Sequence, residues 1–201
     1  MSNLKHWESY LSAGKHGIQY FPEYENRAKA VSAEVTRVVT GQEAAASILA
    51  TLHAVDAKMI VCIPEVIMES INLINIIKET GITVYTKPED IAKYAKEADA
   101  GITEMEFAVA ETGSCVENSA KVEKRLCSTL TNLHIGLLKT DHVVATIADA
   151  FTVFSKTFDC GYLSFITGPS RTADIERVLT IGVHGPARMI PIFIDHVGGI
   201  A

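Results

Sequence analysis

The sequence lacks any apolar run long enough to cross a bilayer: its longest nearly apolar runs are Met59 to Ile63 and Phe107 to Ala110. It also lacks a basic run, because Lys and Arg are scattered and the formal net charge is −6. The first residues, MSNLKHWESY, carry charge where a signal peptide requires an apolar core. We therefore expect a cytoplasmic protein with no membrane span, no export signal and no nucleic-acid partner.

Closely spaced cysteine pairs are missing as well. Cys62, Cys115, Cys127 and Cys160 stand far apart and form no C-x-x-C pair. This spacing favours reduced, mostly buried thiols over a metal or iron–sulfur site. We predict no metal site and no cluster motif in this chain, and the sequence leaves any cofactor unknown.

No repeat, low-complexity segment or linker divides the 201 residues, and 48% of them are hydrophobic. Residues 31–201 are therefore predicted to form a single α/β domain with one core. Residues 1–30 are interpreted as an N-terminal arm, because their aromatic residues follow no lasting periodicity. We expect the arm to pack on the main body, or on a neighbouring subunit of a homo-oligomer, rather than to form a substrate lid.

From Glu34 onward, strand-like runs alternate with helical patterns. Strands are expected over 35–39, 58–63, 82–85, 99–103, 133–138, 163–167 and 189–194. Helices are expected over 42–55, 64–80, 89–98, 141–154 and 172–179, with Asp141 as a cap. Residues 121–131 are expected to form a loop with at most one helical turn. The alternation predicts an open, mainly parallel sheet with helices on both faces, interrupted by a bend or hairpin over 107–116.

The stretch Phe165 to Pro186 concentrates polar and special-geometry residues directly behind a strand. Gly168 stands at a strand-to-helix joint, and Ser170, Arg171 and Thr172 follow it. A helix beginning there would offer free N–H groups and the positive end of its dipole to a phosphate or carboxylate. Hydroxyl groups and the Arg171 guanidinium would add donors, so this joint is a candidate anion site.

The same joint also has a purely structural interpretation. Ser170 or Thr172 caps the helix, and Arg171 points into solvent. Asp174 and Glu176 complement the dipole and compete with any anion for the helix end.

His184 lies in the glycine-flanked turn Gly182 to Pro186, where glycine allows positive φ and a close approach. As a general base or metal ligand it requires a partner, for which His134, His142 or Glu111 are available only if folding brings them close. The alternative is a turn histidine that caps a backbone group.

Glu111 lies at a bend between two apolar runs, two residues before Gly113. A partly buried glutamate there would have a raised pKa and would serve as nucleophile or base. Alternatively, it accepts backbone N–H bonds that hold the bend. Ligands of open α/β sheets bind beyond the carboxyl ends of the strands, so we expect residues 104–106, 111–114 and 168–174 to gather there.

Four strings resemble the LUD domain family in order: AETGS at 110–114, His134-Ile135, GPSRTADIE at 168–176 and GVHGP at 182–186. The resemblance runs from about Val35 to Ile194. It implies a three-layer α/β fold like that of glucosamine-phosphate isomerases, ribose-phosphate isomerases and CoA-transferases. It also implies a role in bacterial oxidation of L-lactate to pyruvate, beside partner proteins of which at least one carries iron–sulfur clusters.

Three functions remain open. We favour a non-redox subunit that binds a small carboxylate, a cofactor or a partner at Arg171. The second is an enzyme acting on CoA thioesters or sugar phosphates, with Glu111 as nucleophile or base and Arg171 as the anion clamp. The third is a regulatory or scaffolding domain, in which the same residues only fix turns. Convergence of Glu111, Arg171 and His184 on one cleft would favour a ligand site.

Overall fold

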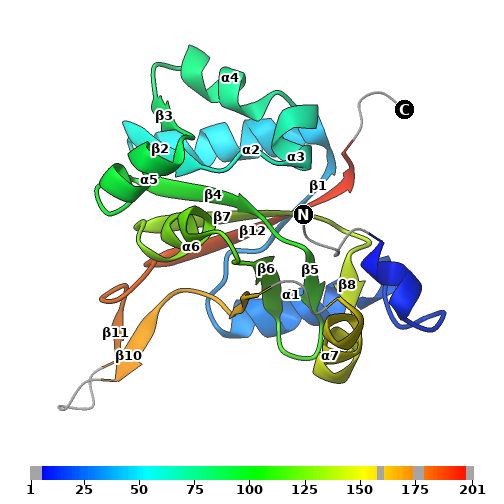
Figure 1. Ribbon diagram of the computed structural model, residues 1–201. Coiled ribbons are helices and arrows are strands. Elements are labelled where there is room, and N and C mark those ends of the chain that lie inside the picture. Colours follow the sequence, from blue (N-terminus) through cyan, green and yellow to red (C-terminus); the bar gives the residue numbers. More distant parts are fainter. Residues whose placement is uncertain (1–5, 158–160, 174–178, 198–201) are drawn as a thin grey trace.

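A computed structural model describes residues 6–157, 161–173 and 179–197. Its centre is a six-stranded sheet, parallel throughout, in the order β1-β12-β7-β4-β2-β3 (Figure 1). The strands are β1 (Thr36–Thr40), β2 (Met59–Cys62), β3 (Thr83–Tyr85), β4 (Ala100–Glu104), β7 (Leu133–Lys139) and β12 (Arg188–His196). Each corresponds to a predicted strand, so this part of the prediction is confirmed.

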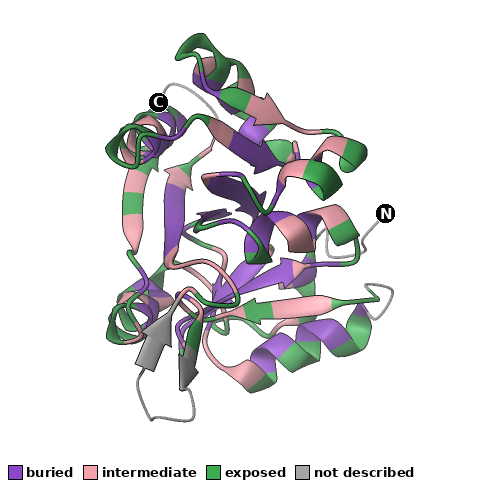
Figure 2. Ribbon diagram, turned by 90° about the vertical axis from the view of Figure 1, so that its left-hand side faces the viewer, coloured by how far each residue is buried: buried purple, intermediate pink, exposed green. Residues whose placement is uncertain are grey.

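Helices cover both faces of this sheet. Because successive side chains of a strand point to opposite faces, Ile60 and Val61 of β2 enter two different cores. Ile60 packs with the helices α2 (Gly41–Ala54), α3 (Val66–Ser70) and α4 (Leu73–Glu79). Val61 packs with α5 (Pro88–Tyr94) and α6 (Val122–Thr129). Figure 2 shows the buried residues in the central strands and on the inner sides of the helices, so the predicted α/β layers are confirmed.

A second, four-stranded sheet lies beside the first, in the order β8-β5-β6-β9. Its strands are β5 (Phe107–Val109), β6 (Ser114–Asn118), β8 (Val143–Val144) and β9 (Leu163–Ile166). β5 and β6 form the predicted antiparallel hairpin. β9 pairs antiparallel with β6 through Glu117 and Ser164. The expectation that this strand ends at the carboxyl edge of the parallel sheet is therefore wrong.

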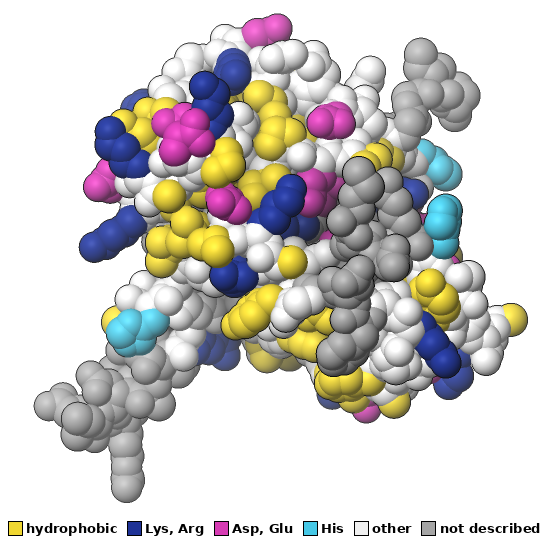
Figure 3. Space-filling model, viewed as in Figure 1, with side chains coloured by type: hydrophobic (Ala, Val, Ile, Leu, Met, Phe, Trp, Pro, Cys, Tyr) yellow, Lys and Arg dark blue, Asp and Glu magenta, His cyan; other side chains and the backbone are white. Residues whose placement is uncertain are grey.

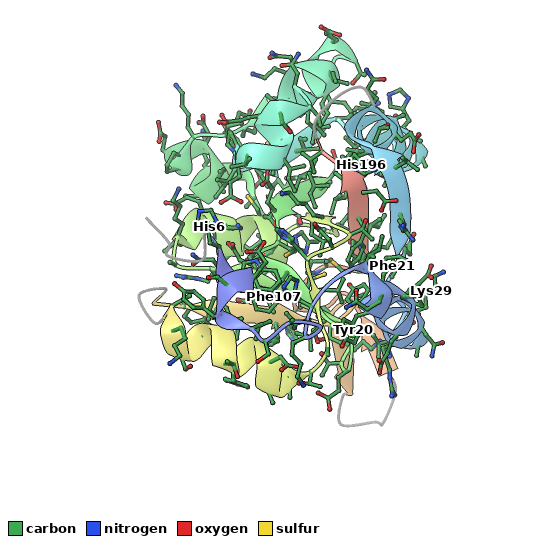
Figure 4. All side chains as sticks on the ribbon, turned by 90° about the vertical axis from the view of Figure 1, so that its right-hand side faces the viewer. His6, Tyr20, Phe21, Lys29, Phe107 and His196 are labelled. Atoms are coloured by element: carbon green, nitrogen blue, oxygen red, sulfur yellow. The ribbon has the colours of Figure 1, made fainter. Side chains whose placement is uncertain are left out.

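The N-terminal residues pack against the second sheet. They form η1 (Trp7–Tyr10), η2 (Ile18–Tyr20) and a helix that the sequence did not predict, α1 (Phe21–Ala30). Trp7 is 2% exposed, and its ring centroid lies 4.9 Å from that of Phe107. Figure 4 shows Phe107 between η1 and α7 (Ile147–Lys156), and Tyr20 leading into α1. Phe21 and Tyr24 of α1 lie in a core with Phe193 of β12.

The helix expected over 64–80 is two helices, α3 and α4. Asn72 between them has a φ of +52°, a left-handed conformation that asparagine tolerates better than most residues. The predicted apolar stripe is nevertheless correct, because Ile67 and Ile77 are buried and Ile71 and Ile74 pack against the same core.

Two further predictions about helices are wrong. Residues predicted as a loop form α6, whose buried side is partly polar and so hid the helical periodicity: Lys124 and Ser128 lie there with Cys127. The helix expected to begin at Asp141 begins at Ile147 instead. Thr146 and Asp149 form a capping box there, in which each side chain accepts from the other residue's backbone N–H.

Within the described ranges, no helix combines the length and the hydrophobicity that a membrane crossing requires.

Candidate functional site

The stretch behind β9 forms a hairpin rather than a helix start. β10 (Arg171–Ala173) pairs antiparallel with β11 (Leu179–Ile181), and both extend away from the body in Figure 1. The helix expected over 172–179 is therefore wrong for the described residues, since β-branched residues favour strands here. Asp174 and Glu176 lie outside the described residues. Without a helix at this joint, the dipole argument for an anion no longer applies.

The residues around Ser170 and the glycine-flanked turn Gly182 to Pro186 do lie together. The Ser170 N–H donates to the Pro186 carbonyl (2.8 Å), and the Gly182 N–H donates to the Ser170 carbonyl (2.9 Å). The next residue, Ala187, donates its N–H to Asn132, just before β7 begins. This unit therefore lies at the amino ends of β7 and β12, opposite the edge where we expected it. His184 is exposed there and makes no hydrogen bond or ion pair to any of the described residues.

The predicted ligand-binding glycines lie against α1 and the residues that follow it. Gly168 has a φ of +77°, and a Cβ there would lie 2.7 Å from the Val31 carbonyl oxygen. Gly113 has a φ of +66°, and a Cβ there would lie 2.8 Å from the Arg27 carbonyl carbon. These glycines allow close packing of two chain segments. Arg171 is exposed, and its Nη2 donates to the Ser32 hydroxyl (2.6 Å).

Glu111 is exposed, so the expected partial burial is wrong. Its Oε2 accepts the backbone N–H of Ile147, the first residue of α7, at 2.8 Å. The alternative interpretation was that Glu111 accepts backbone N–H bonds that hold its own bend. Glu111 does accept a backbone N–H, but this bond fixes the start of α7 rather than the bend. Among the described residues, no hydrogen bond or ion pair joins Glu111 to Arg171 or His184.

Charged side chains do gather at another edge of the fold, the carboxyl ends of β2 and β4. β2 and β4 are neighbours, yet the chain leaves β2 toward α3 and α4 on one face and leaves β4 toward β5, β6 and α6 on the other. This divergence is a topological switch point, and open α/β sheets bind ligands beyond the carboxyl ends of the strands at such a point. Glu104, the last residue of β4, lies there, as the sequence predicted.

We call Glu65, Glu104, Glu106 and Lys124 the switch-point cluster. The Lys124 ammonium lies 2.7 Å from Glu65 Oε2 and 4.0 Å from Glu106 Oε1, and its side chain is only 3% exposed. Glu104 accepts the N–H of Met68 in α3 at 2.7 Å. Glu65 and Glu106 remain partly exposed. On the face shown in Figure 3, acidic and basic side chains lie next to one another near the centre.

A buried hydrogen-bonded chain lies on the α6 side of β4. Glu117 accepts hydroxyl donors from Thr103 (2.8 Å), Ser119 (2.7 Å) and Ser128 (3.0 Å). His134 Nε2 lies 2.9 Å from the Thr103 hydroxyl oxygen. That hydroxyl has one proton, which it gives to Glu117, so Nε2 must be the donor toward Thr103. His134 Nδ1 is then an acceptor, and it is buried without a hydrogen-bond partner among the described residues.

Burial sets the protonation states of these groups. It raises the pKa of Glu104 to about 7, and it raises the pKa of Glu106 and Glu117. Burial, helped by the charge of Lys124, lowers the pKa of His134 to about 3, so this imidazole is neutral. Burial alone would lower the pKa of Lys124, but the neighbouring Glu65 and Glu106 outweigh it and raise the pKa. The cluster thus offers a permanent cation beside a carboxyl that exchanges its proton near neutral pH.

Sequence reasoning identified the 104–106 segment and mentioned His134, but it missed Lys124 and Glu117. Lys124 fell in the predicted loop, and its partner Glu65 is distant in sequence. The only signal in the sequence was the acidic pair Glu104 and Glu106, directly after the strand predicted over 99–103. Cys62, Cys115 and Cys127 are buried and unpaired, and Cys160 lies outside the described residues. Within the described part, no group of three or more His, Cys, Asp or Glu side chains is placed to hold a metal ion.

Comparisons with known proteins agree with the resemblance in the sequence. The family model described as LUD domain matches residues 21–194. Lactate utilization protein C 1 of Bacillus mycoides is 35% identical over 114 residues, covering 54% of this chain and 48% of that protein. Lactate utilization protein C of Bacillus subtilis is 34% identical over 114 residues, with the same coverage. The chain thus spans about half the length of the curated relatives it matches.

One solved structure shares the fold. It is the crystal structure of a DUF162 family protein from Deinococcus radiodurans, with a TM-score of 0.64. The match is 20% identical in sequence and covers 88% of this chain and 96% of that chain.

Proposed function

The chain belongs to the LUD domain family, and we propose that it serves in lactate utilization as a subunit that binds a small carboxylate and carries no redox centre of its own. The names of the matched relatives, lactate utilization protein C, support a role in lactate utilization. The proposed ligand position is the switch-point cluster. Electrons would then pass through iron–sulfur partner proteins of the system rather than through this chain.

The observation that carries the ligand site is the state of Lys124. Its ammonium has three N–H donors but makes one hydrogen bond to the described residues, to Glu65, although its side chain is almost fully buried. Glu106, at 4.0 Å, is beyond hydrogen-bond distance. A buried ammonium with unused donors at a topological switch point is suited to a ligand carboxylate. Glu104 accommodates the added negative charge by taking up a proton near neutral pH.

The thiols support a non-redox role. Burial raises the pKa of Cys62 and of Cys115 to about 12, and it also raises the pKa of Cys127. These groups stay protonated at neutral pH, whereas both metal ligation and thiol redox chemistry require thiolates.

Titration calorimetry of the purified protein with L-lactate and pyruvate at pH 7 tests the proposal. We expect binding that Lys124→Met abolishes and that Lys121→Met, an exposed lysine at the start of the same helix, leaves unchanged. Circular dichroism checks that both variants fold. An Arg171→Ala variant tests the position that the sequence suggested. Loss of binding in that variant, with Lys124→Met still binding, would move the ligand to Arg171 and overturn the switch-point assignment.

A second candidate function is acid–base catalysis, and the raised pKa of Glu104 favours it. In this case the protein is an enzyme for CoA thioesters or sugar phosphates, and Glu104 rather than the exposed Glu111 is the acid or base. Turnover with representative thioesters and sugar phosphates tests this function. Loss of turnover in Glu104→Gln, with Glu111→Gln fully active, would support it, and no turnover by the wild type would exclude it for the substrates assayed.

A further inference from the structure

Strand β9 forms a free edge of the second sheet. The Ser119 N–H donates to the Tyr162 carbonyl (3.0 Å), and along an antiparallel pair only every second residue bonds to its partner strand. The backbone groups of Leu163 and Phe165 therefore point away from β6. Among the residues that the structure describes, no segment hydrogen-bonds to them. β9 thus offers the N–H and carbonyl groups of both residues to a further strand.

The opposite edge of the same sheet is covered. Gly17 donates its N–H to the Val143 carbonyl of β8 (2.8 Å), and Lys15 accepts the N–H of Ala145 (3.0 Å). Soluble proteins protect open edges with such a covering segment, or with charged residues or proline. β9, whose sequence is LSFI, contains no charged residue and no proline. An edge of this composition is suited to pairing with another strand.

Three exposed aromatic side chains flank this edge. Phe151 of α7, Tyr162 and Phe165 are 58%, 56% and 36% exposed. The ring centroid of Phe165 lies 6.2 Å from that of Phe151, on the face of the sheet that α7 covers. Tyr162 lies on the other face, where the Arg125 guanidinium is 4.8 Å from its ring centroid. Since an aromatic side chain has about 150–250 Å² to bury, about 300 Å² of aromatic surface is exposed here.

The spacing of the free residues makes this edge complementary to itself. A second β9 can run antiparallel beside the first with Ser164 opposite Ser164. Leu163 of each copy then lies opposite Phe165 of the other, and each such pair exchanges two hydrogen bonds, so all the free backbone groups are used. Residues directly opposite share a face of the sheet, so Leu163 covers the exposed Phe165, and Ile166 covers Tyr162.

We propose that β9 pairs with β9 of a second copy of this chain, about a twofold axis at Ser164, and joins the two small sheets into one continuous sheet. A specific interface buries at least about 1,000 Å² in total, and the exposed aromatic surface of two copies supplies about 600 Å² of it. An unrelated extended peptide would gain the same hydrogen bonds but would cover the aromatic surface of one copy only. The edge therefore fits a second copy better than a peptide. This inference is independent of the proposed ligand site.

Light scattering after size-exclusion chromatography measures the mass of the assembly, and we expect twice the 21.8 kDa of one chain. Phe165→Lys and Phe151→Lys each place a charge in the interface, and each should raise the dimer dissociation constant roughly 100-fold or more. The matched control is Val39→Lys, which puts a lysine at a 51% exposed apolar residue of β1, an edge strand of the other sheet, and should leave the dimer intact. Circular dichroism checks folding. If Phe165→Lys does not fold, the more exposed Phe151→Lys decides.

Cross-linking tests the register. Two residues opposite each other in a non-hydrogen-bonded pair have Cα atoms about 4.5 Å apart, which is within reach of a disulfide. Ser164→Cys should therefore form a disulfide-linked dimer under mild oxidation. Tyr162→Cys should not, because the two copies of position 162 are four residues out of register, about 14 Å apart. Both variants also carry Cys160→Ser, because Cys160 lies outside the described residues and the other three cysteines are buried.

Loss of the dimer in the lysine variants that fold, with cross-linking at position 164 alone, supports the inference. A wild type that stays monomeric would leave the edge to a strand of another protein and would overturn it. A dimer that survives Phe151→Lys and Phe165→Lys, or that cross-links equally at positions 162 and 164, would overturn it as well, because the two copies would then meet at another surface or in another register.

Discussion

Replacing Gly101 by alanine should loosen the contact between the central sheet and α6, the helix that carries Lys124. A Cβ on Gly101 would collide with the Cys127 carbonyl oxygen and would lie 2.8 Å from the carbonyl carbon and 2.9 Å from the Thr131 hydroxyl. Two of these atoms belong to the backbone of α6, which cannot rotate away as a side chain does. The helix must therefore move as a whole.

The size of the effect follows from packing energetics. Overpacking a close-packed interior costs about 1–3 kcal/mol, and a backbone obstacle places Gly101→Ala at the upper end. Alanine has less conformational freedom than glycine in the unfolded chain, which offsets about 0.4–1 kcal/mol of this loss. We expect a net loss of about 2 kcal/mol in the free energy of unfolding, which is about 4–8 °C in Tm for a chain of this size.

Gly136→Ala is the matched control, because it adds the same methyl to a neighbouring strand of the same sheet. There a Cβ would meet the terminal methyl carbons of Met105 (2.7 Å) and Met189 (3.1 Å), which are flexible and can rotate. We expect a change within about 1 kcal/mol. Urea unfolding at pH 7 measures both variants. Equal losses, or an unaffected Gly101→Ala, would refute the reasoning that α6 rests directly on the β4 backbone.

Three further predictions concern individual side chains. Burial raises the pKa of Glu104 from 4.5 to about 7, so the folded protein binds the carboxyl proton of Glu104 more tightly than the unfolded chain does. The free energy of unfolding should therefore fall by up to about 3 kcal/mol between pH 4.5 and 7 and then level off. Glu104→Gln should flatten this part of the curve in urea titrations, and an unchanged slope would contradict the assignment. Glu111→Ala should cost about 1 kcal/mol through loss of its bond to the start of α7 and leave L-lactate affinity unchanged in calorimetry, whereas loss of affinity would restore its predicted role. Trp7→Phe should lower the free energy of unfolding by about 1–3 kcal/mol, because Trp7 is buried. Trp7 is the single tryptophan, so the native protein should show blue-shifted fluorescence that moves to the red on unfolding. Red-shifted emission from the native protein would mean that the N-terminal arm is not packed on the body.

The parallel sheet could be predicted because its signals are local. The buried run of β2 and the apolar face of α2 are periodic patterns that each element carries in its own residues. The second sheet could not be assigned in the same way. β9 was predicted as a strand from its own residues, but only its pairing with β6, distant in sequence, shows which sheet it joins.

The candidate site shows the same division between local and distant signals. Glu104 was expected at the edge of the sheet because the acidic residues follow a strand directly. Lys124 was not, since a buried lysine depends on acceptors that folding brings to it, here Glu65. Arg171 was misinterpreted for a local reason. Gly-Pro followed by polar residues can begin either a helix or a strand pair, and the residues that pair with β10 come later in the chain.

The position of β12 also affects how the protein is made. β1 joins the sheet through β12 alone, with Thr36 opposite Ile192, and β12 in turn separates β1 from β7. While the chain is still on the ribosome, β1 has no partner strand and the sheet remains in two parts. β1 therefore stays unpaired until β12 has been translated, and a product that ends before β12 exposes one edge of β1 and one edge of β7. In such a fold the six-stranded sheet becomes continuous only after β12 has been made.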